Sequence, residues 1–177
     1  MRRAARRWAG AVARWRRPGR TVLSWTVTAL AAASVVVAAR VWVVEPLRVG
    51  SDSMSPTVDR GAVVLVEKLS PRWRQPARGE LIAFCSPEDG QLILKRVAAV
   101  GGDVVEIRDG RLFVNDGPVD EPSLDAALDD GHYFGPVPVP TGAVFLLGDN
   151  RTNSIDSRDY GPVPLGEIEA RVLLGAR

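Results

Sequence analysis

The chain has 177 residues, of which about 130 remain for a folded domain with one core once an N-terminal segment is set aside. Cys85 is the only cysteine and His132 the only histidine, which excludes an intrachain disulfide, a cysteine-bound metal cluster and metal sites built on several histidines. Residues 1–40 carry nine of the 23 basic side chains and no acidic one, leaving 14 basic against 21 acidic residues beyond them. The sequence pI of about 9.1 therefore belongs to this arm and does not argue for nucleic-acid binding by the domain.

The basic arm, residues 1–20, is followed by an apolar segment. Residues 22–39 contain no charged side chain, and 18 helical residues rise ~27 Å, close to the hydrocarbon thickness of a bilayer. Trp25 and Trp42 lie near the two ends, where interfacial aromatic residues are expected. The pattern predicts a single transmembrane helix over residues 21–45.

A cleavable secretory signal is the competing interpretation of this segment. Its apolar region would normally be shorter, and the Ala-x-Ala spacing here falls inside the run, so we favour a retained anchor. The positive-inside rule places residues 1–20 in the cytoplasm and the domain formed by residues 46–177 on the outer face of the membrane.

Beyond the anchor, short β-branched runs separated by turn residues predict a mostly β domain with a coiled antiparallel sheet or barrel. Asp109-Gly110 is a hairpin signal, and residues 115–140, rich in Asp, Gly and Pro, are interpreted as a long loop or small insertion. The predicted strands are Ala62–Val66, Glu80–Phe84, Leu92–Val100, Val104–Ile107, Leu112–Val114, Val144–Leu147 and Glu167–Leu174.

A serine-rich stretch, residues 51–57, lies just past the predicted anchor. Ser53 precedes a methionine, and Pro56, three residues later, stiffens the turn. A serine becomes a good nucleophile only when a base takes its proton. A polar linker is the alternative interpretation, because such composition is common in loops.

Lys95 is the candidate base, since the only other lysine, Lys68, lies in a polar setting. In a strand over residues 92–100, Lys95 shares a face with Ile93 and Val97. Loss of hydration on an apolar face lowers the pKa of a lysine towards the range of a general base. A snorkelling or ion-paired strand lysine is the alternative, and His132, in a polar loop, is interpreted as a surface residue.

A third stretch, residues 148–161, follows a predicted strand and contains hydroxyl, carboxylate and guanidinium groups between glycines. Asp156 and Arg158 are two residues apart, so they share a face in an extended segment and can pair. The alternative is a polar turn that satisfies its own hydrogen bonds.

Taken in order, these stretches resemble the type I signal peptidases (leader peptidases), in their compact Gram-positive or actinobacterial form. The matching blocks are Ser-x-Ser-Met-x-Pro-Thr at 51–57, Lys-Arg-Val with Gly-Gly-x-Val at 95–104, and Gly-Asp-Asn-Arg-x-x-Ser-x-Asp-Ser-Arg-x-x-Gly at 148–161. The resemblance implies a membrane-bound serine endopeptidase that cleaves N-terminal signal peptides from secreted preproteins, with a barrel-like catalytic domain.

The resemblance also implies a Ser–Lys dyad without cofactor or metal. Ser53 would attack the scissile carbonyl, and neutral Lys95 would take its proton and later activate water. Ser51 would join the backbone N–H of Ser53 in the oxyanion hole.

Three further residues would support this dyad: Ser154 would orient the lysine, and Asp156 with Arg158 would brace the site. The implied partners are secretory preproteins and plasma-membrane lipid, with a monomeric chain and no nucleic acid. A Ser–Lys peptidase dedicated to one pilin or conjugation precursor and an inactive, membrane-tethered β-domain that binds secreted chains both remain alternatives. An inactive paralogue should have lost at least one site residue, so the complete set favours the enzyme.

Overall fold

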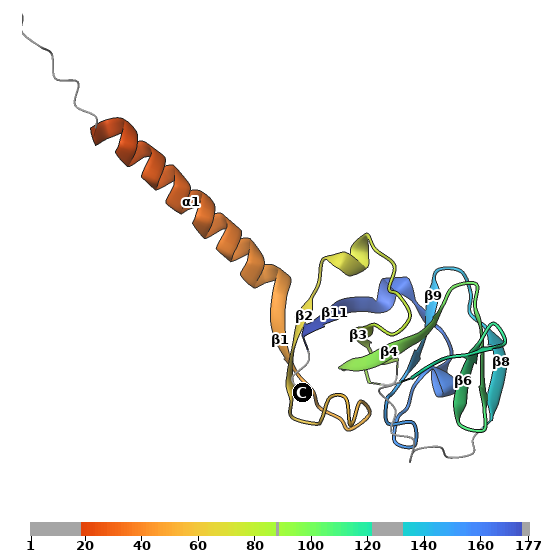
Figure 1. The fold of residues 1–177 in the computed structure, drawn as a ribbon. Helices are drawn as coiled ribbons and strands as arrows, with labels where there is room; N and C mark the ends of the chain where they lie inside the picture. The colour runs from red at the N-terminus through yellow and green to blue at the C-terminus, as the bar shows by residue number, and fades with distance from the viewer. Residues whose placement is uncertain (1–18, 88, 122–132, 175–177) are drawn as a thin grey trace, which may run out of the picture. The chain divides into compact units, whose positions relative to one another are not determined.

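The structure is a computed structural model that describes residues 19–87, 89–121 and 133–174. The chain divides after Arg40 into two units. Helix α1, Gly19–Val43, occupies the segment for which the sequence predicts an anchor (Figure 1). Within the described residues, no helix combines the length and the hydropathy that a membrane crossing requires. The membrane-spanning role of residues 21–45 stays a prediction, and most of the basic arm lies outside the described residues.

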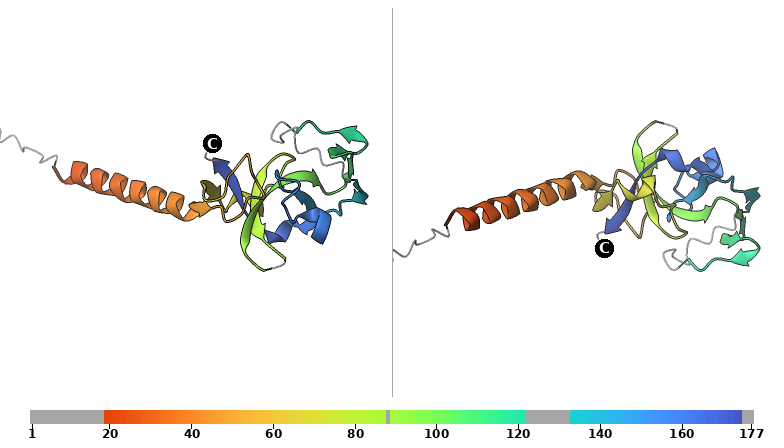
Figure 2. Two further views of the ribbon diagram at one scale, coloured as in Figure 1. Left: turned by 90° about the horizontal axis from the view of Figure 1, so that it is seen from below. Right: turned by 90° about the horizontal axis from the view of Figure 1, so that it is seen from above.

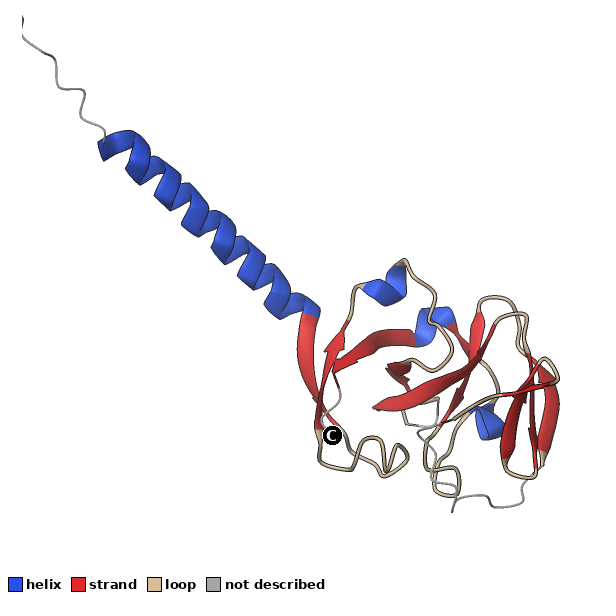
Figure 3. Ribbon diagram, viewed as in Figure 1, coloured by secondary structure: helices blue, strands red, loops and turns tan. Residues whose placement is uncertain are grey.

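The second unit, residues 41–177, is mostly β, as predicted, and its larger sheet is antiparallel and curled into a half-barrel (Figure 3). Seven strands follow the spatial order β1-β2-β11-β3-β4-β9-β10. Their bounds are β1 Val44–Arg48, β2 Val63–Glu67, β3 Leu81–Cys85, β4 Leu92–Val100, β9 Ala143–Leu147, β10 Val163–Pro164 and β11 Ile168–Leu174. Short helical turns, η1 Ser70–Arg72, α2 Ser157–Tyr160 and η3 Leu165–Glu167, connect some of these strands.

A smaller antiparallel sheet, ordered β7-β6-β5-β8, lies on the side of β4 and β9 (Figure 2). It comprises β5 Val104–Arg108, β6 Arg111–Val114, β7 Gly117–Pro118 and β8 Phe134–Pro138. The predicted hairpin joins β5 to β6, and Asp109 and Gly110 both have positive φ, 52° and 75°, as this tight turn requires. The stretch 115–140 contributes β7 and β8, while residues 122–132, including His132, lie outside the described part of the chain.

The described residues of the domain form three buried apolar clusters, and one of them holds the serine-rich loop in place. In this cluster Met54 packs with Val64 of β2 and Leu94 of β4, and its side chain is 1% exposed. A second cluster joins the two sheets, and the third lies around Ile82, Phe84 and Leu146. The strand that carries Lys95 therefore has the loop that carries Ser53 packed against it.

Candidate active site

Ser53 lies in the loop that connects β1 to β2, and it is 6% exposed. The N–H of Ser55 donates to the carbonyl oxygen of Asp52 (3.1 Å), and the N–H of Val58 donates to that of Met54 (2.9 Å). These turns and the buried Met54 side chain hold the serine hydroxyl in one place, which a reacting nucleophile requires.

Ser51 lies on the solvent side of the same loop, and its hydroxyl contacts that of Ser53. The two Oγ atoms are 3.1 Å apart, and either can donate the hydrogen bond. Among the described residues, the backbone N–H of Ser53 donates to no protein group. A hydroxyl and a backbone N–H beside one nucleophile are suitable donors for an oxyanion.

Lys95 lies in the middle of β4 and is 2% exposed, so burial removes water from its ammonium group. Burial lowers the pKa of Lys95 from 10.5 to about 8. The nearby charges act less strongly: the carboxylate of Asp156 raises this pKa, and the guanidinium of Arg158 lowers it. The strand predicted over residues 92–100 has the observed bounds, and its lysine has a pKa lowered by burial.

Ser154 and Gly148 connect the lysine to the nucleophile loop. Lys95 Nζ donates a hydrogen bond to Ser154 Oγ (2.8 Å). A Cβ atom on Gly148 would lie 2.2 Å from Ser154 Oγ and 2.7 Å from the carbonyl oxygen of Ser53, so only glycine fits there. The N–H of Asn150 also donates to the Ser53 carbonyl (3.0 Å). The segment after β9 therefore packs against the backbone of Ser53 and carries Ser154, the hydrogen-bond partner of Lys95.

No hydrogen bond joins the described side chains of Ser53 and Lys95 directly in this structure. The hydroxyl of Ser53 contacts Ser51, and the ammonium group contacts Ser154. Proton transfer between Ser53 and Lys95 therefore requires the serine hydroxyl and the lysine amine to come within hydrogen-bond distance of each other. Catalytic hydrogen bonds are often completed only when substrate is bound.

Asp156 and Arg158 form a bidentate ion pair next to Gly148. Arg158 Nε and one terminal nitrogen donate to the two carboxylate oxygens of Asp156 at 2.9 and 3.0 Å. Asp156 is fully buried, and it also accepts the N–H of Gly148 (3.0 Å) and the N–H of Arg158, which caps α2. The predicted pair exists, and it fixes the glycine that lies between Ser53 and Ser154.

Sequence reasoning missed a second ion pair at the same turn. Arg96 Nε and a terminal nitrogen donate to the carboxylate of Asp149 at 2.7 and 2.5 Å, and a third donor reaches the carbonyl oxygen of Gly79 (2.8 Å). Asp149 is 1% exposed, so its charge needs this partner. The adjacency of Arg96 to the candidate lysine and of Asp149 to Gly148 was the available signal.

The candidate site contains hydroxyl, ammonium and ion-paired groups rather than a metal-binding set. In residues 19–87, 89–121 and 133–174, no group of three or more His, Cys, Asp or Glu side chains is arranged to hold a metal ion. The arrangement can supply a nucleophile, a base of suitable pKa and oxyanion donors, which together suit acyl transfer.

Comparison with known proteins gives consistent matches. The model of the family "Signal peptidase, peptidase S26" matches residues 22–175. Thylakoidal processing peptidase 1 of Arabidopsis thaliana is 38% identical over 155 residues, which is 81% of this chain and 45% of that protein. Probable signal peptidase I-2 of Synechocystis is 33% identical over 164 residues, covering 89% of this chain and 74% of that one.

A crystal structure of a signal peptidase I from Enterococcus faecalis is 34% identical, with a TM-score of 0.51 over 57% of this chain and 98% of that chain. The chain spans less than half the length of the two Arabidopsis relatives that it matches, 45% and 36%.

Proposed function

Because the chain belongs to the signal peptidase family, peptidase S26, we propose that it is a serine endopeptidase that removes N-terminal signal peptides from secreted preproteins with a Ser53–Lys95 dyad. One observation carries this assignment: a buried lysine with a pKa of about 8 donates to Ser154, and Ser154 and the nucleophile loop both lie against Gly148. This geometry supports a neutral amine base beside the serine.

The lowered pKa decides whether the base is available. At pH 7.5 a lysine of pKa 10.5 is neutral in about one molecule in a thousand, whereas a pKa of about 8 leaves roughly a quarter neutral. The gain in competent base is therefore about two hundred-fold. Arginine cannot supply it, because the guanidinium group stays protonated.

In the acylation step, Ser53 Oγ forms a bond to the carbonyl carbon of the scissile peptide as its proton moves to Lys95 Nζ. When the tetrahedral intermediate collapses, the C–N bond breaks and Lys95 returns that proton to the leaving amine. The products are an ester on Ser53 and the free N-terminus of the mature protein. Ser154 keeps the lysine in position throughout.

The negative oxygen of the intermediate needs donors during these steps. The hydroxyl of Ser51 and the backbone N–H of Ser53 are the candidates on this side of the nucleophile, and each acts most strongly where water is excluded. In deacylation, neutral Lys95 takes a proton from water, whose oxygen attacks the ester carbon. The bond from this carbon to Ser53 Oγ then breaks, and Lys95 returns the proton to Oγ.

For the location, we propose the single anchor of the sequence interpretation, with the arginine-rich arm in the cytoplasm and the domain on the outer face of a bacterial plasma membrane. It is supported by the uncharged run of residues 22–39 behind eight basic residues within 1–20. The preprotein is itself held in the membrane by its signal sequence, so an anchored peptidase meets it in two dimensions. Small residues before the scissile bond are the expected specificity.

The test is cleavage of a signal-peptide-bearing preprotein by the purified full chain in detergent. We expect cleavage after a small residue by the wild type and loss of cleavage in Ser53→Ala, Lys95→Ala and Lys95→Arg. Lys68→Ala is the matched control, because Lys68 is a partly exposed lysine that pairs with Glu45 (2.6 Å), and it should keep full activity. Turnover in Lys95→Ala would reject the dyad, and no cleavage by folded wild type would favour a dedicated peptidase or a binding domain.

A further inference from the structure

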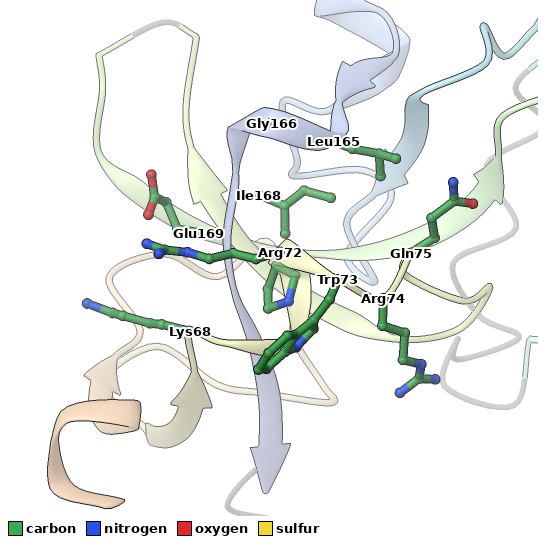
Figure 4. A pocket seen from close by; sticks show the side chains of 10 residues that line it. Lys68, Arg72, Trp73, Arg74, Gln75, Leu165, Gly166, Ile168 and Glu169 are labelled. Carbon is green, nitrogen blue, oxygen red and sulfur yellow. The ribbon is translucent and has the colours of Figure 1, made fainter. Parts of the chain in front are cut away.

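A cavity of the domain lies away from Ser53, at the loop between β2 and β3. It has a volume of about 520 Å³ and is bounded by this loop on one side and by η3 and the start of β11 on the other (Figure 4). The loop contributes Lys68, Arg72, Trp73 and Arg74, whereas Glu169 is the one acidic residue of the lining. Three of the four charged residues of the lining are therefore cationic.

Trp73 is the most unusual residue of this loop, because its indole is 77% exposed. In Figure 4, Lys68 and Arg72 extend to one side of it, and Arg74 and Gln75 extend to the other. An exposed indole between two arginines contributes little to a hydrophobic core. Keeping its apolar surface in contact with water also costs free energy. Amphipathic aromatic side chains with flanking cations are typical of surfaces at the headgroup level of a bilayer.

The cationic side chains of the loop form only weak ion pairs with other described residues of the protein. Lys68 pairs with Glu45 and Arg74 pairs with Glu80 (2.8 Å), and both pairs are partly exposed, so each contributes little to stability. Arg72 makes no ion pair with any other described residue. These cations can therefore turn to an external anion at small cost.

The backbone fixes where this loop begins. The N–H of Lys68 donates to the carbonyl oxygen of Val43 (3.1 Å), and Val44 is the register partner of Glu67. Lys68 therefore lies beside the residue at which α1 ends and the domain begins. If the segment before Val44 is the membrane anchor, its exit from the bilayer lies next to the first cation of the loop.

We propose that residues 68–75 form an interfacial loop that docks on a bilayer containing anionic lipid. Arg72 and Lys68 bind lipid phosphate groups, Trp73 lies among the headgroups, and the contact sets the orientation of the domain on the membrane. This inference rests on the anchor proposed above. It adds a second, electrostatic attachment at a surface distinct from the catalytic loop.

The test places a polarity-sensitive fluorophore at residue 73 of the full chain, as Trp73→Cys in a Cys85→Ser background, and reconstitutes the protein in vesicles. In phosphatidylcholine containing phosphatidylglycerol we expect a blue shift and quenching by spin-labelled lipid, both reversed by salt. The matched control is Tyr133→Cys in the same background, because Tyr133 is an aromatic residue with similar exposure, 74%, directly before β8 of the smaller sheet. The fluorophore at residue 133 should report an aqueous environment in neutral and in anionic vesicles alike.

The charge contribution is measured with Arg72→Gln, which should lower the ratio of docked to undocked loop about fivefold in the anionic vesicles. Arg111→Gln, which removes an exposed arginine of β6, should leave this ratio unchanged. Equal quenching in neutral and anionic vesicles, or quenching that appears only when preprotein is added, would overturn the proposal. The latter result would indicate a peptide site.

Failure of this proposal is distinguishable from failure of the proposed function. Arg72→Gln should cleave preprotein in detergent at the wild-type rate, because the loop is not part of the site. An undocked loop with normal cleavage therefore rejects only the lipid contact. Release of the full chain from vesicles by alkaline washing would remove the anchor on which the contact depends.

Discussion

Replacing Lys95 with methionine should abolish cleavage and, at neutral pH, stabilise the folded domain. The folded-state pKa of about 8 lies below the unfolded value of 10.5, so the unfolded chain holds its proton more tightly. The penalty for burying the charged form is therefore complete below pH 8 and disappears above pH 10.5. It amounts to about 3 kcal/mol at pH 7 and to less than about 1 kcal/mol at pH 10.

Methionine also loses the hydrogen bond to Ser154, which costs about 1 kcal/mol at every pH. We therefore expect Lys95→Met to raise the free energy of unfolding by about 2 kcal/mol at pH 7 and to leave it nearly unchanged at pH 10. The measurement is urea unfolding of both proteins in the same detergent at the two pH values.

The control is Lys68→Met, whose difference from the wild type should stay within about 1 kcal/mol and should not change with pH. Packing changes caused by methionine are independent of pH, so the change between the two pH values isolates the charge. If Lys95→Met were destabilised equally at pH 7 and pH 10, burial would not be what lowers the pKa of this lysine.

Three other predictions concern catalysis. The wild-type kcat/KM should rise about tenfold per pH unit below pH 8 and then level off, and a rise that continued well beyond pH 9 would contradict a neutral Lys95 as base. Ser51→Ala should lower kcat by roughly 10²–10³ with little change in KM, whereas an effect on KM alone would assign Ser51 to substrate binding. Asp156→Asn removes a charge that raises the pKa of Lys95 and removes the buried ion pair with Arg158, so the midpoint of the pH profile should fall and the Tm should drop; a raised midpoint would contradict this electrostatic reading.

The strands that could be predicted are those whose apolar pattern is local. Leu92–Val100 has the same bounds in prediction and structure, because this largely apolar run is bounded by turns on both sides. The hairpin at Asp109-Gly110 was equally visible, since both positions need positive φ. In both cases a few neighbouring residues decide the conformation.

The missed strands depend on partners far along the chain. β1 continues the apolar run of the predicted anchor, and only Pro46 in Glu45-Pro46 signals that the helix has ended before it. β8 lies in a segment rich in proline and glycine, and it becomes a strand because Val137 pairs with Val105. No local pattern encodes such pairing.

The site residues were named from the motifs, but their contacts were not. The hydrogen bond from Lys95 to Ser154 joins residues 59 positions apart, and the close approach at Gly148 brings in a third segment. Spacing along the chain predicted that Asp156 and Arg158 could pair, because only one residue separates them. It could not predict that their pair also binds the N–H of Gly148.

These contacts together resolve a conflict in the chemistry of an amine base. A buried lysine is most stable beside a carboxylate, yet such a partner raises its pKa and removes the neutral form that catalysis needs. Here Arg158 binds both oxygens of Asp156, and Lys95 donates instead to an uncharged hydroxyl, that of Ser154. Desolvation therefore remains the strongest influence on the lysine, and its pKa stays at about 8. The guanidinium of Arg158 opposes the rise that the Asp156 carboxylate causes in the pKa of Lys95, so a variant without Arg158 would have a more basic and less active lysine.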